Sequence, residues 1–140
     1  MSHRLLKMSV IGIALMNAAG FAFAEKWIEV AASPKVRYLV DEDSLERQGT
    51  LVTGWTKFVF RKNPPKIGMK PLAYQLSHET FSCTSHDSRV LLAVSYDNEG
   101  SSLQEVKNLP YEETVPGSAG ELMRAFVCAA RVWEDAPKTN

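Results

Sequence analysis

Cysteine and histidine are scarce in this sequence, with two and three residues respectively among 140. The histidines form no cluster, and no paired carboxylates suggest a general acid and a general base. There is also no internal repeat and no low-complexity segment. These absences leave no residue pattern that favours an enzyme, a bound metal or a cofactor.

Net charge is also absent, because 16 basic residues balance 16 acidic ones. A near-neutral chain gives no general argument for binding nucleic acid or an acidic membrane. The chain is long enough for one domain with a single core, with little room for a second.

The first 24 residues have the three parts of a secretory signal peptide. Arg4 and Lys7 make the start positive, an apolar run follows, and Ala22-Phe23-Ala24 has the small residues that signal peptidase reads. The alternative, a buried or transmembrane helix, is disfavoured because the run is at the short limit for a span. We therefore expect a signal peptide at 1–24, one domain at 25–135 and a flexible tail at 136–140. The product would be exported to the periplasm, the cell surface or the medium, with no stable membrane span.

N-terminal sequencing of the exported protein should read Glu25-Lys26-Trp27, because we expect cleavage between Ala24 and Glu25. Recovery of an intact Met1 on membrane-embedded protein would instead show that the apolar run is an anchor.

The segment HETFSCTSHD, residues 78–87, places histidines, acids and a cysteine within ten positions. It could form a metal site, a nucleophilic cysteine site or half of a disulfide. HETFS lacks the second histidine of H-E-x-x-H, and His78 and Cys83 would point to opposite sides of a strand. In an oxidising compartment an even number of cysteines indicates a disulfide. We expect Cys83 to pair with Cys128, which would stabilise the fold by about 4 kcal/mol.

Alternating apolar residues and turn signals predict strands at 26–33, 35–41, 50–60, 71–83, 88–96 and 101–109. In the third strand an uncharged set should face the core, namely Val52, Gly54, Thr56, Phe58 and Phe60. Residues 41–49 predict a turn or one helical turn capped by Asp41 or Asp43 and ended by Gly49. Pro64-Pro65 excludes a central strand and predicts a connection at 61–70.

The pattern becomes helical after Pro116. Ser118 and Glu121 fit a capping box, S-x-x-E. An apolar stripe follows at helical spacing, with Arg124 and Arg131 on the opposite side. The stripe consists of Leu122, Ala125, Phe126, Ala129 and Trp133. Strands followed by one helix predict an α+β fold, an antiparallel twisted sheet of about five to six strands with a C-terminal helix packed on it.

The order of several motifs resembles the bacterial surface-adhesin protein E family. The motifs are Trp27, RYLVDEDSL, LVTGWTKFVF, the SC at Cys83, YDNEG, and PGSAGELMRAFVCAA around Cys128. The resemblance implies a secreted or envelope domain that binds without catalysis, with host matrix proteins as the ligands that give the family its name. It assigns no ligand-binding residue.

One segment suggests a binding surface, because no acidic residue occurs from Gln48 to His78. Its basic residues are Lys57, Arg61, Lys62, Lys66 and Lys70. Four of them lie on or beside the Pro-Pro loop and could meet sulfated glycans, acidic host proteins or lipopolysaccharide phosphates. The alternative is a solvated loop that keeps a β-rich chain soluble.

The sequence therefore predicts a non-enzymatic binding domain, with a protein partner or a sulfated glycan as the ligand. A periplasmic inhibitor or accessory factor that engages another secreted protein is the alternative. Both a monomer and a homodimer are compatible with the sequence.

Overall fold

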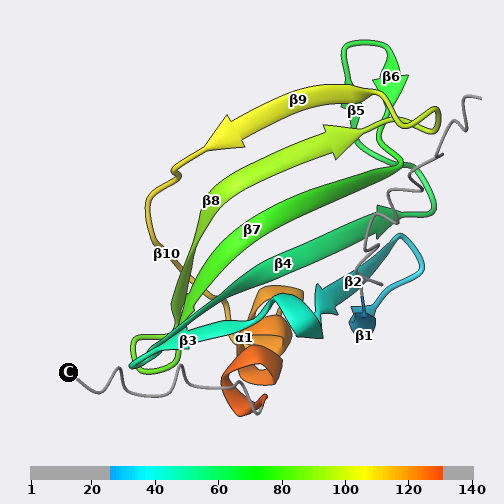
Figure 1. The fold of residues 1–140 in the computed structure, drawn as a ribbon. Helices are drawn as coiled ribbons and strands as arrows, with labels where there is room; N and C mark the ends of the chain where they lie inside the picture. Colours follow the sequence, from blue (N-terminus) through cyan, green and yellow to red (C-terminus); the bar gives the residue numbers. More distant parts are fainter. Residues whose placement is uncertain (1–25, 131–140) are drawn as a thin grey trace, which may run out of the picture.

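The protein is an α+β fold, as the sequence predicts, in a computed structural model that describes residues 26–130 (Figure 1). The expectations for cleavage after Ala24, for Arg131 and Trp133, and for the tail at 136–140 lie outside these residues. The strands are β1 (Trp27–Ala32), β2 (Val36–Asp41), β3 (Glu46–Gln48), β4 (Leu51–Phe60), β5 (Lys66–Ile67), β6 (Lys70–Pro71), β7 (Tyr74–Ser82), β8 (Asp87–Tyr96), β9 (Ser102–Lys107) and β10 (Glu112–Glu113). A 3₁₀ helix, η1 (Glu42–Ser44), follows β2, and the α-helix α1 (Ala119–Ala129) follows β10.

The main sheet is antiparallel and has eight strands in the described part of the chain. Its order is β1-β2-β4-β7-β8-β10, with β3 also paired to β4 and β9 also paired to β8. The long central pair β4–β7 runs in register from Leu51 opposite Ser82 to Val59 opposite Tyr74. The six longer strands of this sheet are those that the sequence predicts, while β3 and β10 are short additions.

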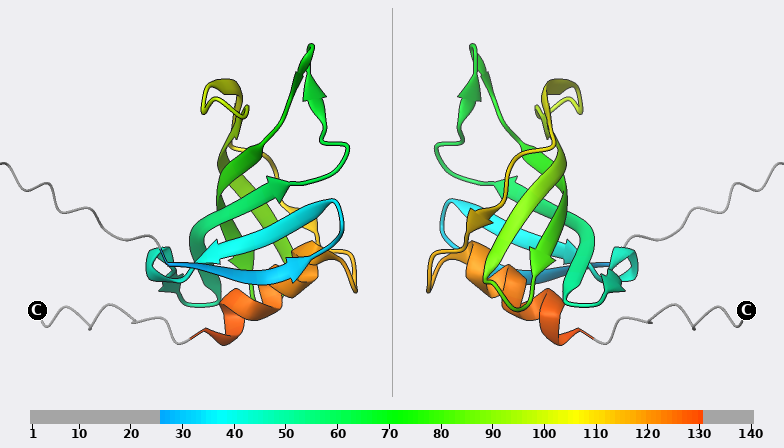
Figure 2. Two further views of the ribbon diagram at one scale, coloured as in Figure 1. Left: turned by 90° about the vertical axis from the view of Figure 1, so that its right-hand side faces the viewer. Right: turned by 90° about the vertical axis from the view of Figure 1, so that its left-hand side faces the viewer.

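The helix packs against one face of the sheet, at one end, where it contacts β1, β2 and β7. Val52, Gly54 and Thr56 of β4 are buried on this face, which confirms the predicted orientation of the strand. Phe58 and Phe60 are only partly buried, and Phe58 packs against the apolar cluster. The buried apolar cluster joins both layers and contains Val40, Leu45, Val52, Phe81, Met123 and Val127. Figure 2 shows α1 below the strands, with the β5–β6 hairpin at the other end of the molecule.

The segment after β2 differs from the prediction of one turn ended by Gly49. η1 is capped by Asp41, as proposed, but β3 then returns to pair with β4. A glycine at position 54 makes this detour possible, because a Cβ there would lie 2.5 Å from the Cδ2 atom of Leu45. The Ser44 hydroxyl also accepts a hydrogen bond from the Trp55 amide at 2.8 Å. The local turn signals could not reveal this contact with β4.

The N-terminus of α1 follows the sequence prediction only in part. The Ser118 hydroxyl accepts a hydrogen bond from the Glu121 amide, as in a capping box. The Glu121 carboxylate does not return to the Ser118 amide, which donates to the Val115 carbonyl instead. It accepts hydrogen bonds from the Thr114 hydroxyl and from the Arg124 guanidinium.

The predicted apolar stripe of α1 is wrong at Leu122, Ala125 and Ala129, which are exposed, whereas Phe126 packs against the core as expected. Met123, Arg124 and Val127 are buried, whereas Leu122 is 48% exposed. Arg124 can be buried because two of its nitrogen atoms donate to the two Glu121 oxygens, at 2.9 and 2.6 Å. The spacing of apolar residues could not predict this bidentate pair, which lies within one helical turn, and so it placed Arg124 on the exposed side of the helix.

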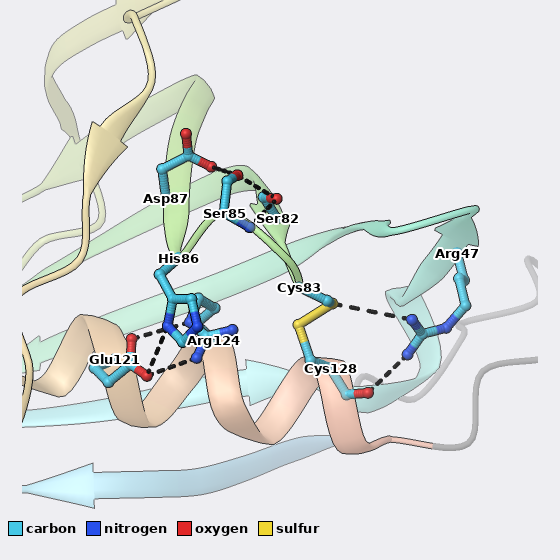
Figure 3. Close-up of a disulfide and its surroundings, with 9 residues drawn as sticks. All are labelled: Arg47, Ser82, Cys83, Ser85, His86, Asp87, Glu121, Arg124 and Cys128. Carbon is cyan, nitrogen blue, oxygen red and sulfur yellow. Dashed lines mark hydrogen bonds and ion pairs between the residues drawn. A yellow bond between two sulfur atoms is a disulfide. The ribbon is translucent and has the colours of Figure 1, made fainter.

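The C-terminus of α1 is attached covalently to the sheet. Cys83, directly after β7, forms the predicted disulfide with Cys128, with a Cα–Cα distance of 5.6 Å. Figure 3 shows Arg47 of β3 beside this bond. Arg47 donates to the Cys128 carbonyl at 2.8 Å and lies 3.9 Å from the Cys83 sulfur. Because the last turn of α1 has no basic residue of its own, Arg47 provides the cation that favours a helix C-terminus.

A carboxyl group lies inside the fold on the same face as the helix. Glu79 of β7 is 7% exposed, and desolvation raises its pKa from 4.5 to about 7, although a hydrogen bond with Thr56 acts in the opposite direction. The Thr56 hydroxyl lies 3.4 Å from the Ser77 carbonyl, to which it can donate. The hydrogen bond with Thr56 favours the ionised carboxylate, whereas burial favours the neutral acid and is the larger of the two effects.

Loss of the disulfide should destabilise the domain without changing its fold class. Cys83→Ser and Cys128→Ser should each lower the free energy of unfolding by about 2–5 kcal/mol. The double variant should be little worse than either single one, because both changes remove the same bond. Denaturant unfolding measures these values, and the oxidised protein should be about 2 Da lighter than the reduced form. Two free thiols in material from an oxidising compartment would contradict this assignment.

Glu79 should make the domain less stable as the pH rises. Its folded pKa of about 7 lies above the usual 4.5, so the proton stabilises the fold fully below pH 4.5. This contribution, roughly 1–3 kcal/mol, should be lost as the pH rises towards and through 7. Glu79→Gln should remove that loss in thermal melts from pH 5 to pH 8. An unchanged pH dependence in the variant would show that Glu79 is already ionised in the fold.

Candidate functional site

The segment at 78–87 does not form one reactive site. His78 lies on the face of the sheet away from α1 and stacks on Trp55, with ring centroids 4.9 Å apart. Glu79 lies on the opposite face, and Cys83 is in the disulfide. Asp87 accepts a hydrogen bond from the Ser85 hydroxyl at the turn between β7 and β8. Within residues 26–130, no three histidine, cysteine or acidic side chains are placed to share a metal ion.

His86 belongs to a structural network instead. Its Nδ1 atom lies 3.6 Å from Glu121, which also binds Arg124 (Figure 3). Glu121 accepts a further hydrogen bond from the Thr114 hydroxyl. The hydrogen bonds from Arg124 and then from Thr114 lower the pKa of Glu121 to about 2. The Glu121 carboxylate therefore stays ionised over the physiological pH range and fixes the start of α1 to the β7–β8 turn. These contacts stabilise the fold, because they connect the β7–β8 turn to the first turn of α1.

The basic loop forms a protruding hairpin, which we call the basic hairpin, residues 61–73. It includes the short strands β5 and β6, which the sequence did not predict, and it projects beyond the sheet (Figures 1 and 2). Hydrogen bonds close its base, from the Phe60 amide to the Ala73 carbonyl and from the Leu72 amide to the Pro65 carbonyl, both at 2.9 Å. Leu72 is buried at this base. The hairpin is thus attached at its base while its outer residues face solvent.

The structure divides the five predicted binding residues into two groups. Arg61, Lys62, Lys66 and Lys70 are exposed on the basic hairpin. Lys57 instead lies on the sheet, with its ammonium 4.8 Å from the ring centroid of Tyr74 and 5.5 Å from that of Trp27. Lys57 is therefore held by aromatic rings rather than joined to the other four.

Lys70 has a counter-ion within the described part of the chain. Its ammonium lies 3.5 Å from Asp97 at the β8–β9 turn. Hydrogen bonds from the Ser101 and Glu99 amides also lower the pKa of Asp97. Among residues 26–130, no ion pair involves Arg61, Lys62 or Lys66. These three carry the available positive charge.

A second candidate surface is the sheet face away from α1, which the sequence analysis missed. Cross-strand pairing gathers aromatic rings there, including the stacked pair Tyr74–Tyr96 with centroids 4.7 Å apart. A shallow pocket of about 170 Å³ lies beside them, and its lining residues are Trp27, Asp41, Trp55 and Leu76. The sequence did place Trp55 and Lys57 on the strand face opposite the predicted core. Which side chains of the neighbouring strands lie beside them depends on the strand register, which the sequence does not give.

These features define a small α+β domain with a disulfide and two candidate binding surfaces. No helix among residues 26–130 has the length and apolar composition needed to cross a bilayer. Residues 27–129 match the family model of surface-adhesin protein E, so the chain belongs to that family. No curated protein and no solved structure matches the chain.

Proposed function

We propose that this protein is an exported, non-enzymatic binding domain that attaches to host matrix proteins or sulfated glycans through its basic hairpin. Membership of the surface-adhesin protein E family supports an exported location and a binding role. The observation that carries the proposal is the set of exposed cations Arg61, Lys62 and Lys66 on the basic hairpin, which form no ion pair with any residue at 26–130. Exposed cations attract sulfate and carboxylate groups over a range set by the ionic strength.

The alternative function is an accessory factor or inhibitor that engages another secreted protein. The aromatic sheet face favours it, because tryptophan and tyrosine are frequent anchors of protein interfaces. The stacking of Trp55 on His78 and of Tyr74 on Tyr96 limits their motion before a partner arrives. Such rings lose little side-chain entropy on binding. Protease treatment of intact cells separates the two functions, because an adhesin must be accessible and a periplasmic factor is protected.

Replacing Arg61, Lys62 and Lys66 with glutamine tests the basic hairpin. Arg61→Gln/Lys62→Gln/Lys66→Gln should weaken binding to heparin or to a matrix protein such as vitronectin about tenfold at physiological salt, about 1.4 kcal/mol in total. The melting temperature should hardly change, because the three side chains are exposed. Added salt should weaken the wild type more than the triple variant.

Two matched double variants control for net charge. Lys62→Gln/Lys66→Gln should weaken heparin binding, whereas Lys26→Gln/Lys107→Gln should not, although both remove two exposed lysines. Equal losses in the two doubles would mean that overall charge, not the hairpin, attracts the ligand. Equal affinity of the wild type and the folded triple variant would exclude the basic hairpin as the binding surface.

A further inference from the structure

The tip of the basic hairpin carries an apolar residue that is almost fully in solvent. Met69 is 93% exposed and follows Gly68, whose positive φ of 61° suits the first central position of a tight hairpin turn. Glycine, asparagine and aspartate are the usual residues of such turns. A methionine at the tip contributes nothing to the core, so its apolar surface is available to a partner.

Basic residues lie on both strands behind this tip and near the base of the hairpin. Lys66 and Lys70 lie on the two strands of the hairpin, with Ile67 opposite Lys70 and Lys66 opposite Pro71. Arg61 and Lys62 follow β4, near the base. Lysine and arginine have long apolar stems, so they can extend a charge to a headgroup while the tip enters a less polar layer. An apolar tip with basic residues behind it combines the two attractions that hold proteins at anionic lipid surfaces.

We propose that the basic hairpin also docks the protein on an anionic lipid surface. Met69 enters the boundary between headgroups and acyl chains, while Arg61, Lys62 and Lys66 contact headgroup phosphates. The proposal uses the same cations as the proposed function but not its ligand. The exposed tip favours a lipid over a sulfated glycan, because a glycan offers no apolar layer in which Met69 could be buried.

Two acidic residues lie beside the basic hairpin, on one side of it. Asp97 is at the base of the hairpin, where its carboxylate is 8% exposed and binds Lys70. Its neighbour Glu99 lies in the same β8–β9 turn and lines a pocket of about 180 Å³ with Lys70 and Pro71. Both acids therefore lie at the β6 side of the hairpin and not at the Gly68–Met69 turn.

Vesicle sedimentation with the mature protein tests the proposal. The vesicles contain phosphatidylcholine alone or phosphatidylcholine with about a third of phosphatidylglycerol. Wild type should bind only the anionic vesicles, and more weakly as salt is added. Met69→Ser should lower that partitioning about tenfold, or about 1.4 kcal/mol. Met69→Leu should preserve it, because leucine restores an apolar tip.

Three controls separate this proposal from the proposed function. Met69→Ser should bind heparin like the wild type, whereas the triple cation variant should bind both heparin and the anionic vesicles more weakly. Val115→Ser changes another exposed apolar residue and should leave vesicle binding unchanged. Thermal melts should show that all variants fold.

The outcomes are distinguishable. Wild type that does not sediment with anionic vesicles, or Met69→Ser that sediments equally well, overturns the lipid proposal and leaves heparin binding untouched. A triple variant that keeps heparin binding but loses the vesicles overturns the role of the hairpin in glycan binding and supports the lipid proposal.

Discussion

The attachment of α1 to one end of the sheet is the constraint on which the rest of the structure depends. An isolated helix of 11 residues is marginal in water, so α1 needs tertiary contacts to persist. The disulfide and Arg47 fix its C-terminus, and the Glu121 network fixes its N-terminus to the β7–β8 turn. With both ends held, Met123 and Val127 remain against the sheet and complete the apolar cluster.

Because α1 covers only one end of the sheet, the buried side chains on this face change from apolar to polar along the strands. Beyond the apolar cluster, the buried positions on this face are small and polar, such as Thr56, Ser77 and Ser95. Glu79 is buried between these two regions, opposite Gly54 and Val90. No cation is among the causes of the pKa shift of Glu79, so burial favours the neutral form of its carboxyl group.

Much of the fold could be predicted because its signals are local. Alternation along β4 gave the correct buried face, and Ser118 marked the start of α1. The errors arose where a distant residue decides the outcome. Periodicity placed Arg124 in solvent, although its bidentate pair with Glu121 permits burial. The β3 strand exists because Gly54 leaves space for Leu45, a contact between two segments that no short window contains.

The sequence predicted one of the two candidate surfaces, the basic hairpin, better than the other, the aromatic sheet face. The basic hairpin was visible as a run without acids, interrupted by Pro64-Pro65. The exposed tip at Met69 needed the turn geometry, and the aromatic face needed the register of β4 against β7. Composition along the chain shows where charge gathers, whereas pairing between strands decides which side chains lie together.

The two candidate surfaces are neighbours, which affects how each can be separated experimentally. β4 and β7 carry the aromatic face and lead directly into the base of the hairpin, where the Ala73 amide donates to the Tyr96 carbonyl at 2.8 Å. Lys57 contacts Trp27 and Tyr74, so replacing it would disturb the aromatic rings together with the charge. Arg61, Lys62 and Lys66 have no such contacts among the described aromatic residues. Changes at those three positions therefore isolate charge from packing, whereas a change at Lys57 alters both.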